Sequence, residues 1–185
     1  MEQLIWFSIP GALLCATLFV VCSSSADEIV LWIAVAPVIG FVVHQVFRLG
    51  FEVAGGFASK RRKVLYHIIQ DLEVVSYKQA FLVWEVTFYS NDMPASFRDH
   101  DRGAWHYILS FWGISLAAFV SLGLCLLGYL LVAHRSDVLY MALAQLVVLV
   151  IFALKGWTTY QSLMEQELAV FHVLKTKFRD IAKQI

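Results

Sequence analysis

Charged side chains are scarce in this sequence. Only 15% of its 185 residues are Asp, Glu, Lys or Arg, whereas an average soluble domain contains about 25%. Hydrophobic residues make up 60% of the chain. These proportions exclude an ordinary soluble domain and indicate an integral membrane protein.

Catalytic motifs are missing as well. The sequence has no Gly-rich phosphate loop, no Gly-x-Ser-x-Gly and no Cys-x-x-Cys. Its three cysteines, Cys15, Cys22 and Cys125, lie in or at the edge of apolar runs, so buried packing is expected rather than a disulfide scaffold. We therefore expect no enzymatic activity, no catalytic residue, no cofactor and no metal.

Four long apolar runs contain no Asp, Glu, Lys or Arg. They extend from Leu4 to Val21, Ile29 to Phe47, Trp105 to Val132 and Val138 to Leu154. Each is about long enough to cross ~30 Å of hydrocarbon as a helix that rises ~1.5 Å per residue. Because a charge at mid-depth is costly and is retained only for use, its absence argues against an ion-coupled pump.

The loops within the two pairs of runs are short, from Cys22 to Glu28 and from Ala133 to Asp137. Each pair is therefore predicted to form an antiparallel hairpin. Arg135 is the only one of fourteen Lys and Arg residues on the side of these loops, so both termini and the middle segment should be cytoplasmic. The predicted parts are a hairpin at 1–49, a cytoplasmic helical segment at 50–103, a second hairpin at 104–157 and a cytoplasmic helix at 158–185.

The third run carries small residues at intervals of three or four: Ser110, Gly113, Ala117, Ser121, Cys125 and Gly128. This spacing stacks them on one helical face. Such a face either lets another helix approach closely or leaves room for water and ions. In the second interpretation, the pore-lining residues are Ser110, Gly113, Ala117, Ser121 and Gly128. A four-span subunit is small, so a pore would lie on the symmetry axis of a homo-oligomer.

The second run contains a candidate hinge. Pro37 removes one backbone hydrogen bond and is expected to kink the helix. Gly40 lies between Ala36 and His44 at the same small-residue spacing. A kink beside a small face suits a gate and also suits ordinary helix packing.

The middle segment begins with a basic cluster of Lys60, Arg61, Arg62 and Lys63. These cations with nearby Tyr66 and His67 form a candidate ligand site, where the cations hold phosphates and the rings stack on bases. Four basic residues just inside a membrane also mark topology and contact lipid headgroups. Arg62 and His67 further fit an Arg-x4-His spacing like that of helical ribonuclease folds.

Three cytoplasmic helices and one loop are expected after this cluster. A helix needs a partner to cover its apolar stripe, which is formed by Val64, Leu65, Ile68, Ile69, Leu72 and Val75. The run Ala80 to Tyr89 is too short to span a bilayer. It could extend the preceding helix, lie in the membrane interface or form a short strand, and a helix packed at an oligomer or membrane surface is favoured. Asn91 to Gly103 is predicted as a loop around Pro94, and Thr158 to Gln184 as one long helix that continues the fourth run.

Histidines leave a second class of function open. His44 and His106 lie near the cytoplasmic ends of neighbouring runs, and His100 lies among aspartates in the predicted loop. A haem- or metal-binding membrane enzyme or redox subunit is therefore an alternative. A passive membrane scaffold for a cytoplasmic partner is another.

A weak internal repeat accompanies the order of elements. Val64-Leu65-Tyr66-His67-Ile68 is echoed by Val170-Phe171-His172-Val173. One hairpin with its helix (Leu4 to Phe47, Lys60 to Tyr89) is thus followed by another (Trp105 to Leu154, Thr158 to Gln184), which would give the subunit two similar halves.

This order resembles that of the small membrane effectors of bacterial nucleotide-signalled anti-phage defence systems. The resemblance implies an oligomeric ion channel or pore in the bacterial inner membrane, in contact with membrane lipid. It also implies regulation from the cytoplasm by a nucleotide or oligonucleotide made by a partner nucleotidyltransferase.

Overall fold

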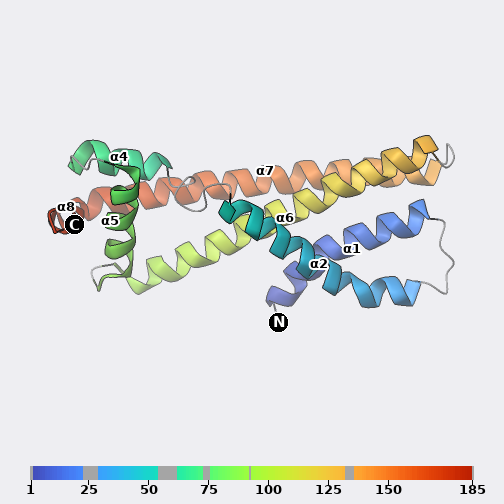
Figure 1. The fold of residues 1–185 in the computed structure, drawn as a ribbon, viewed down its shortest axis with the longest axis horizontal. Helices are drawn as coiled ribbons and strands as arrows, with labels where there is room; N and C mark the ends of the chain where they lie inside the picture. Colours follow the sequence, from blue (N-terminus) through green and yellow to red (C-terminus); the bar gives the residue numbers. More distant parts are fainter. Residues whose placement is uncertain are drawn as a thin grey trace. The chain divides into compact units, whose positions relative to one another are not determined.

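The computed structural model describes residues 2–22, 29–53, 62–72, 76–91, 93–131 and 136–184. Side chains are described in these ranges except at 2–7, 48, 50–53, 62 and 63. Within this part of the chain every regular element is an α-helix, and there are seven of them (Figure 1). The all-α prediction is confirmed.

Three of the helices are long and apolar enough to cross a membrane. They are residues Ile29–Phe47 of α2 (Ile29–Val53), α6 (Ala95–Leu131) and α7 (Ser136–Val173). In α1 (Glu2–Val21), the apolar part with described side chains, Ser8–Val21, is shorter. A membrane location thus rests on three helices, and a span formed by α1 stays a prediction.

The chain forms two compact units. Unit 1 consists of Met1–Gly50 and Tyr107–Trp157, and unit 2 consists of Phe51–His106 and Thr158–Ile185. The helices α6 and α7 pass from one unit to the other, so each unit contains a part of both.

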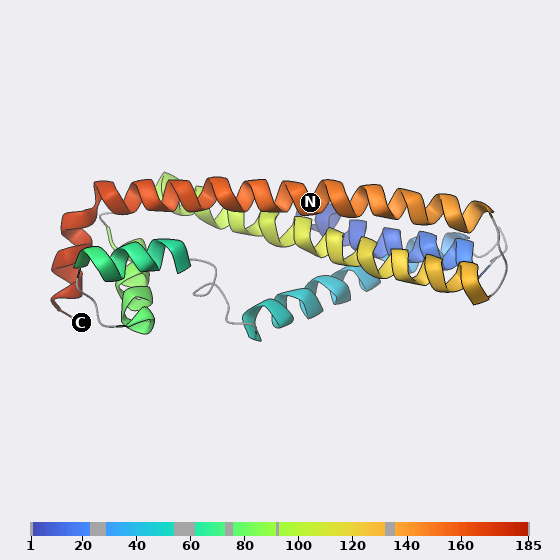
Figure 2. The same ribbon diagram turned by 90° about the horizontal axis from the view of Figure 1, so that it is seen from above.

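Unit 1 contains α1, most of α2, and the apolar parts of α6 and α7. The last two run antiparallel and side by side (Figures 1 and 2). Near one end of the pair, Cys125 of α6 packs against Val138 and Ala142 of α7, and Val20 and Val21 of α1 lie against this cluster. Three helices thus share one apolar core.

Unit 2 surrounds an aromatic core. It contains α4 (Arg62–Leu72), α5 (Tyr77–Tyr89) and α8 (Lys175–Ala182), with the first part of α6 and the last part of α7. The ring of Trp84 in α5 stacks on Phe178 of α8 at a centroid distance of 5.6 Å. Phe171 of α7 meets Phe178 edge to face at 5.2 Å. Large aromatic surfaces buried in this way dominate the stability of small cores.

Local signals account for α4 and α5. Val64, Leu65 and Ile68 of α4 are fully buried. Of the other predicted stripe residues, Ile69 and Leu72 are half-buried and Val75 lies outside the described residues, so the stripe is confirmed in its first part. In α5, the Ser76 hydroxyl accepts a hydrogen bond from the amide of Gln79 at 3.2 Å, which caps the helix N-terminus. The helix predicted at Ala80 to Tyr89 is confirmed.

The predicted loop from Asn91 to Gly103 is wrong from Ala95 onward, because α6 already begins there. The carbonyl oxygen of Pro94 accepts hydrogen bonds from the amides of Phe97 and Arg98 and so starts the first turn. Proline next to a helix start loses no needed donor. The glycine at 103 does not interrupt the helix.

The predicted continuous helix from Thr158 to Gln184 is interrupted at Leu174, which separates α7 from α8. Phe178 is fully buried between Trp84 and Phe171 beyond this break. The change of direction is what brings Phe178 into the aromatic core, and burial of a phenyl ring contributes about 1.5–3 kcal/mol.

Candidate functional site

The residues predicted to line a pore lie in the interior of unit 1. Each member of this α6 face is buried: Ser110, Gly113, Ala117, Ser121 and Gly128. In the described structure, helices of the same chain cover the face. The close-packing interpretation accounts for this burial, and a role in a pore stays a prediction.

Different helices cover different positions along the α6 face. A Cβ at Gly113 would lie 3.8 Å from Nδ1 of His44 in α2, and a Cβ at Gly128 would lie 2.7 Å from Cγ1 of Val21 in α1. Cys125, between them in sequence, packs against α7. Small residues allow this close approach of three neighbours.

Three buried polar side chains on three different helices lie within this packing, and we call Thr17, Ser121 and Gln145 the mid-span cluster. Nε2 of Gln145 in α7 donates a hydrogen bond to Oγ1 of Thr17 in α1 at 3.1 Å. The Thr17 hydroxyl donates to the carbonyl oxygen of Leu13 at 2.9 Å. None of the three side chains is more than 2% exposed.

Helix register places Ser121 beside Gln145. Ser121 lies one turn before Cys125, which packs against Ala142, and Ala142 lies one turn before Gln145 on the antiparallel helix. Within the described part of the chain, Oγ of Ser121 and Oε1 of Gln145 are buried without a hydrogen-bond partner. Each such atom costs about 1–3 kcal/mol when it stays unpaired.

The chemistry of the mid-span cluster is neutral. Hydroxyl and amide groups donate and accept hydrogen bonds, but they do not exchange protons near neutral pH. The cluster can therefore bind water or replace part of the hydration shell of an ion, and it offers no general acid or base.

The candidate hinge residues lie at a crossing of α1 and α2. A Cβ at Gly11 would collide with the carbonyl oxygen of Ala36 and would lie 2.6 Å from the amide nitrogen of Gly40. Gly40 is thus buried at the point of closest approach, whereas Pro37 is exposed. The two backbones touch because Gly11 has no side chain.

The basic part of the candidate ligand site falls largely outside the described residues. Lys60 and Arg61 lie outside them, and Arg62 and Lys63 belong to α4 without a described side chain. The remaining members, Tyr66 and His67, are an exposed and a half-buried residue of α4. The Tyr66 hydroxyl accepts a hydrogen bond from Nε2 of Gln70 at 2.6 Å.

His67 belongs to a second polar group, which we call the His-Asp-Lys cluster: His67, Asp71, His172 and Lys175. The rings of His67 and His172 lie edge to face at a centroid distance of 6.1 Å. Nζ of Lys175 donates to Oδ2 of Asp71 at 2.7 Å. The cluster joins α4 to the end of α7 and the start of α8 within unit 2.

The pKa of Asp71 is lowered from its ordinary value of 3.8, chiefly by the hydrogen bond from Lys175. Partial burial opposes this effect, while the charge of Lys175 and the neighbouring rings of His67 and His172 add to it. Asp71 therefore stays ionised and holds Lys175 in place.

The histidines considered for haem or metal are distributed over the chain. His44 lies in unit 1, and His106 lies in unit 2. A nitrogen of the His100 ring, Nε2, lies 2.9 Å from Oε1 of Gln166 in unit 2. Among the described residues, no group of three or more His, Cys, Asp or Glu side chains has the arrangement of a metal site.

Sequence reasoning missed Thr17, Asp71 and Lys175 as members of these clusters. Thr17 is one of the few polar residues in the first run, and that contrast was a usable signal. Asp71 follows His67 by four residues, which places the two side chains beside each other on α4. Lys175 follows His172 by three residues but lies beyond the break at Leu174, so spacing alone could not place it.

No family model matches the chain, and no curated protein or solved structure matches it either. Inference about function therefore depends on the mid-span cluster in unit 1 and on the His-Asp-Lys cluster in unit 2.

Proposed function

We propose that the chain is a four-span subunit of an oligomeric ion channel in the bacterial inner membrane, with both termini in the cytoplasm. Three helices support the membrane location. With 20 residues, α1 is about 30 Å long at ~1.5 Å per residue and can supply the fourth span. The bias of Lys and Arg away from the short loops supports the orientation.

The observation that carries the proposal is the mid-span cluster. A passive anchor could pack with apolar side chains alone, yet Thr17, Ser121 and Gln145 bury polar atoms on three helices, and two of them are joined by a hydrogen bond. Polar groups inside a membrane protein mark pathways for water and ions. We assign the conduction path to the small α6 face, which requires α1 to separate from α6 and α7 when the channel opens.

The candidate hinge at Pro37 and Gly40 supports a mechanism for this opening. Pro37 interrupts the hydrogen-bond ladder of α2, and Gly40 holds α2 against Gly11 of α1. Bending at Pro37 would shift α1 with α2 and expose the covered face to water. The described arrangement then corresponds to a closed channel.

Regulation by a nucleotide or oligonucleotide is proposed for unit 2. Lys175, His172 and the exposed ring of Tyr66 offer the donors and the stacking surface that phosphates and bases require. The basic residues at 60–63 would add positive charge at the start of α4. Antiviral defence, in which opening harms an infected cell, is the physiological role that this proposal gives the channel.

Ion flux through purified protein in liposomes tests the channel. We expect Ser121→Leu and Gly113→Leu to block flux, because each places a branched side chain on the proposed path. Gly123→Leu is the matched control, since a Cβ at Gly123 has no atom within 4 Å. Equal ion flux in all three variants would show that the conduction path does not follow this face. Absence of flux through the wild-type protein under any ligand would favour a scaffold.

A panel of cyclic and linear oligonucleotides tests the ligand. We expect one class to shift the thermal unfolding of the wild-type protein, and Lys175→Ala to weaken the shift about tenfold in ligand concentration, which corresponds to the loss of about 1.4 kcal/mol from one charged hydrogen bond. Lys183→Ala, an exposed lysine on the same C-terminal segment, should keep it. If no nucleotide shifts the thermal unfolding, the proposed regulation by a nucleotide is wrong.

A further inference from the structure

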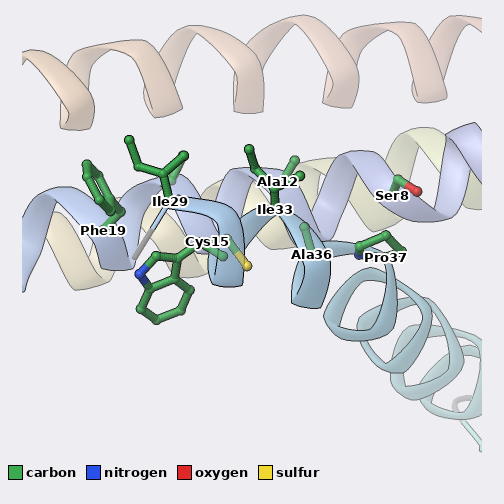
Figure 3. A pocket seen from close by; sticks show the side chains of 10 residues that line it. Ser8, Ala12, Cys15, Phe19, Ile29, Ile33, Ala36 and Pro37 are labelled. Atoms are coloured by element: carbon green, nitrogen blue, oxygen red, sulfur yellow. The ribbon is translucent and has the colours of Figure 1, made fainter. Parts of the chain in front are cut away.

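An apolar groove lies between α1 and α2 on unit 1. It has a volume of about 510 Å³ and is lined by ten residues, five from each helix (Figure 3). Figure 3 shows Phe19 and Ile29 at one end and Ser8 and Pro37 at the other. The groove thus follows the helices from the start of α2 to its proline.

Small side chains give the groove its depth. Ala12 and Ala16 on α1 are exposed and line it, with Ala36 of α2 on the opposite side. Ser8 is the one lining residue with a hydroxyl. A groove of this volume lies within the ~300–1,000 Å³ range of sites that hold a single small molecule.

The surroundings of the groove are those of a lipid-facing surface. Val30, Ile33 and Val38 of α2 are more than 60% exposed. Because α2 is apolar enough to span a membrane, these side chains lie against hydrocarbon when the protein is in a bilayer. In a bilayer the groove is therefore open to lipid hydrocarbon.

Trp32 adds a polar feature at one end. It lines the groove, and its indole Nε1 is buried without a hydrogen-bond partner among the described residues. Trp32 is in the first turn of α2, the level at which tryptophans meet the boundary between hydrocarbon and headgroups. A buried indole N–H requires an acceptor.

We infer that the groove binds one acyl chain of a phospholipid, with an ester carbonyl of that lipid accepting the hydrogen bond from Trp32 Nε1. Ester carbonyls lie at the hydrocarbon boundary, and the chain extends from there toward Ser8 and Pro37. A helix of a second copy is a poorer occupant, since its backbone carbonyls are already hydrogen-bonded within the helix. This lipid site is separate from the proposed conduction path and does not depend on channel activity.

Phospholipid immobilisation measures the site directly. The full chain is reconstituted in vesicles of phosphatidylcholine that contain a spin-labelled phospholipid, and the motionally restricted fraction is recorded by electron spin resonance. We expect Ala16→Phe to remove one restricted lipid per chain by filling the groove. Ala34→Phe is the control, because Ala34 is exposed on α2 outside the groove lining.

The ester carbonyl is tested with ether-linked phosphatidylcholine, which lacks it. We expect the restricted lipid to be lost in ether-linked vesicles and also in Trp32→Phe, while Trp157→Phe, an exposed tryptophan of α7, keeps it. Retention in both would overturn the role of the hydrogen bond.

Two results would overturn the lipid site as a whole. One is an equal number of restricted lipids in wild type, Ala16→Phe and Ala34→Phe. The other is dissociation of an oligomer in Ala16→Phe without a change in restricted lipid, which would assign the groove to a second copy. Ala12→Phe repeats the measurement if circular dichroism shows that Ala16→Phe is not helical.

Discussion

The rings of His67 and His172 lie edge to face at 6.1 Å, and these are the histidines that correspond in the internal sequence repeat. Their neighbours differ in burial, since Tyr66 and Val173 are exposed whereas Phe171 and Ile68 are fully buried. The end of α7 thus meets α4 at the two repeated histidines, while the residues beside them do not match. The ion pair of Asp71 and Lys175 closes the same contact at 2.7 Å.

Asp71→Asn should weaken unit 2 in a pH-dependent manner. The pKa of Asp71 is lower in the folded protein than its ordinary value of 3.8, so its stabilisation is complete above that value and disappears as the pH falls below it. Because the Lys175 side chain is 38% exposed, we expect only about 0.2–1 kcal/mol at neutral pH and low salt. Chemical unfolding of wild type and variant over an acid pH series measures the difference. Asp180→Asn, which changes an exposed carboxylate of α8, is the control, and an equal loss of stability there would contradict the assignment.

Thr17→Val should destabilise unit 1 more than Gln145→Leu does. The valine removes the oxygen acceptor of Gln145 Nε2 and leaves it only the weak acceptor Sδ of Met141 at 3.7 Å, at a cost of about 1–2 kcal/mol. Leucine instead removes the whole amide, including the buried Oε1. The double variant should then resemble Gln145→Leu. Unfolding in mixed detergent micelles measures all three proteins, and strictly additive changes would show that the two side chains do not interact.

Gly11→Ala should be poorly tolerated. The new methyl group would collide with the carbonyl oxygen of Ala36, and separation of two packed backbones costs about 1–3 kcal/mol. Gly123→Ala in α6 meets no neighbour and should stabilise its helix by about 0.5–1 kcal/mol. Thermal unfolding in detergent compares the two variants. Equal melting temperatures would contradict the close crossing of α1 and α2.

Phe178→Ala should release α8 from unit 2. The ring is fully buried between Trp84 and Phe171, and its removal is expected to cost about 3–5 kcal/mol. Val173→Ala, at a residue that is 82% exposed, should cost little. Amide hydrogen exchange over α8 measures the loss of protection, and unchanged protection in Phe178→Ala would contradict this account of the break at Leu174.

Sequence periodicity predicted which residues share a helix face, but it did not predict which helix packs against that face. The stripe at Val64, Leu65 and Ile68 is buried as expected, and the small face of α6 is continuous. Spacing fixes which residues share a face, but it carries no information about which helix covers that face. For this reason the contacts of Gly113 and Gly128 with α2 and α1 could not be predicted.

The predicted helix ends were wrong for a related reason. The Pro94 region reads locally as a loop, and the start of α6 at Ala95 depends on contacts of its first turns within unit 2. The break at Leu174 is not encoded by a proline or glycine there; it follows from the burial of Phe178, a tertiary effect that local propensity does not contain. Only part of the mid-span cluster could be predicted from the sequence. Gln145 is conspicuous as a polar residue in its apolar run, whereas Thr17 acquires meaning only as the partner of Gln145.

The division of α6 and α7 between the two units has a practical consequence. The rings of Trp105 and Tyr160 lie 6.3 Å apart, so the two helices are neighbours near the residues where unit 2 ends. Antiparallel helices are joined by turns of about 2–5 residues. A protein that links residues 62–106 to 158–184 through such a turn would omit the most apolar helical segments and keep His67, Asp71, His172 and Lys175. Ligand binding at these residues could then be measured by calorimetry in plain buffer, without detergent.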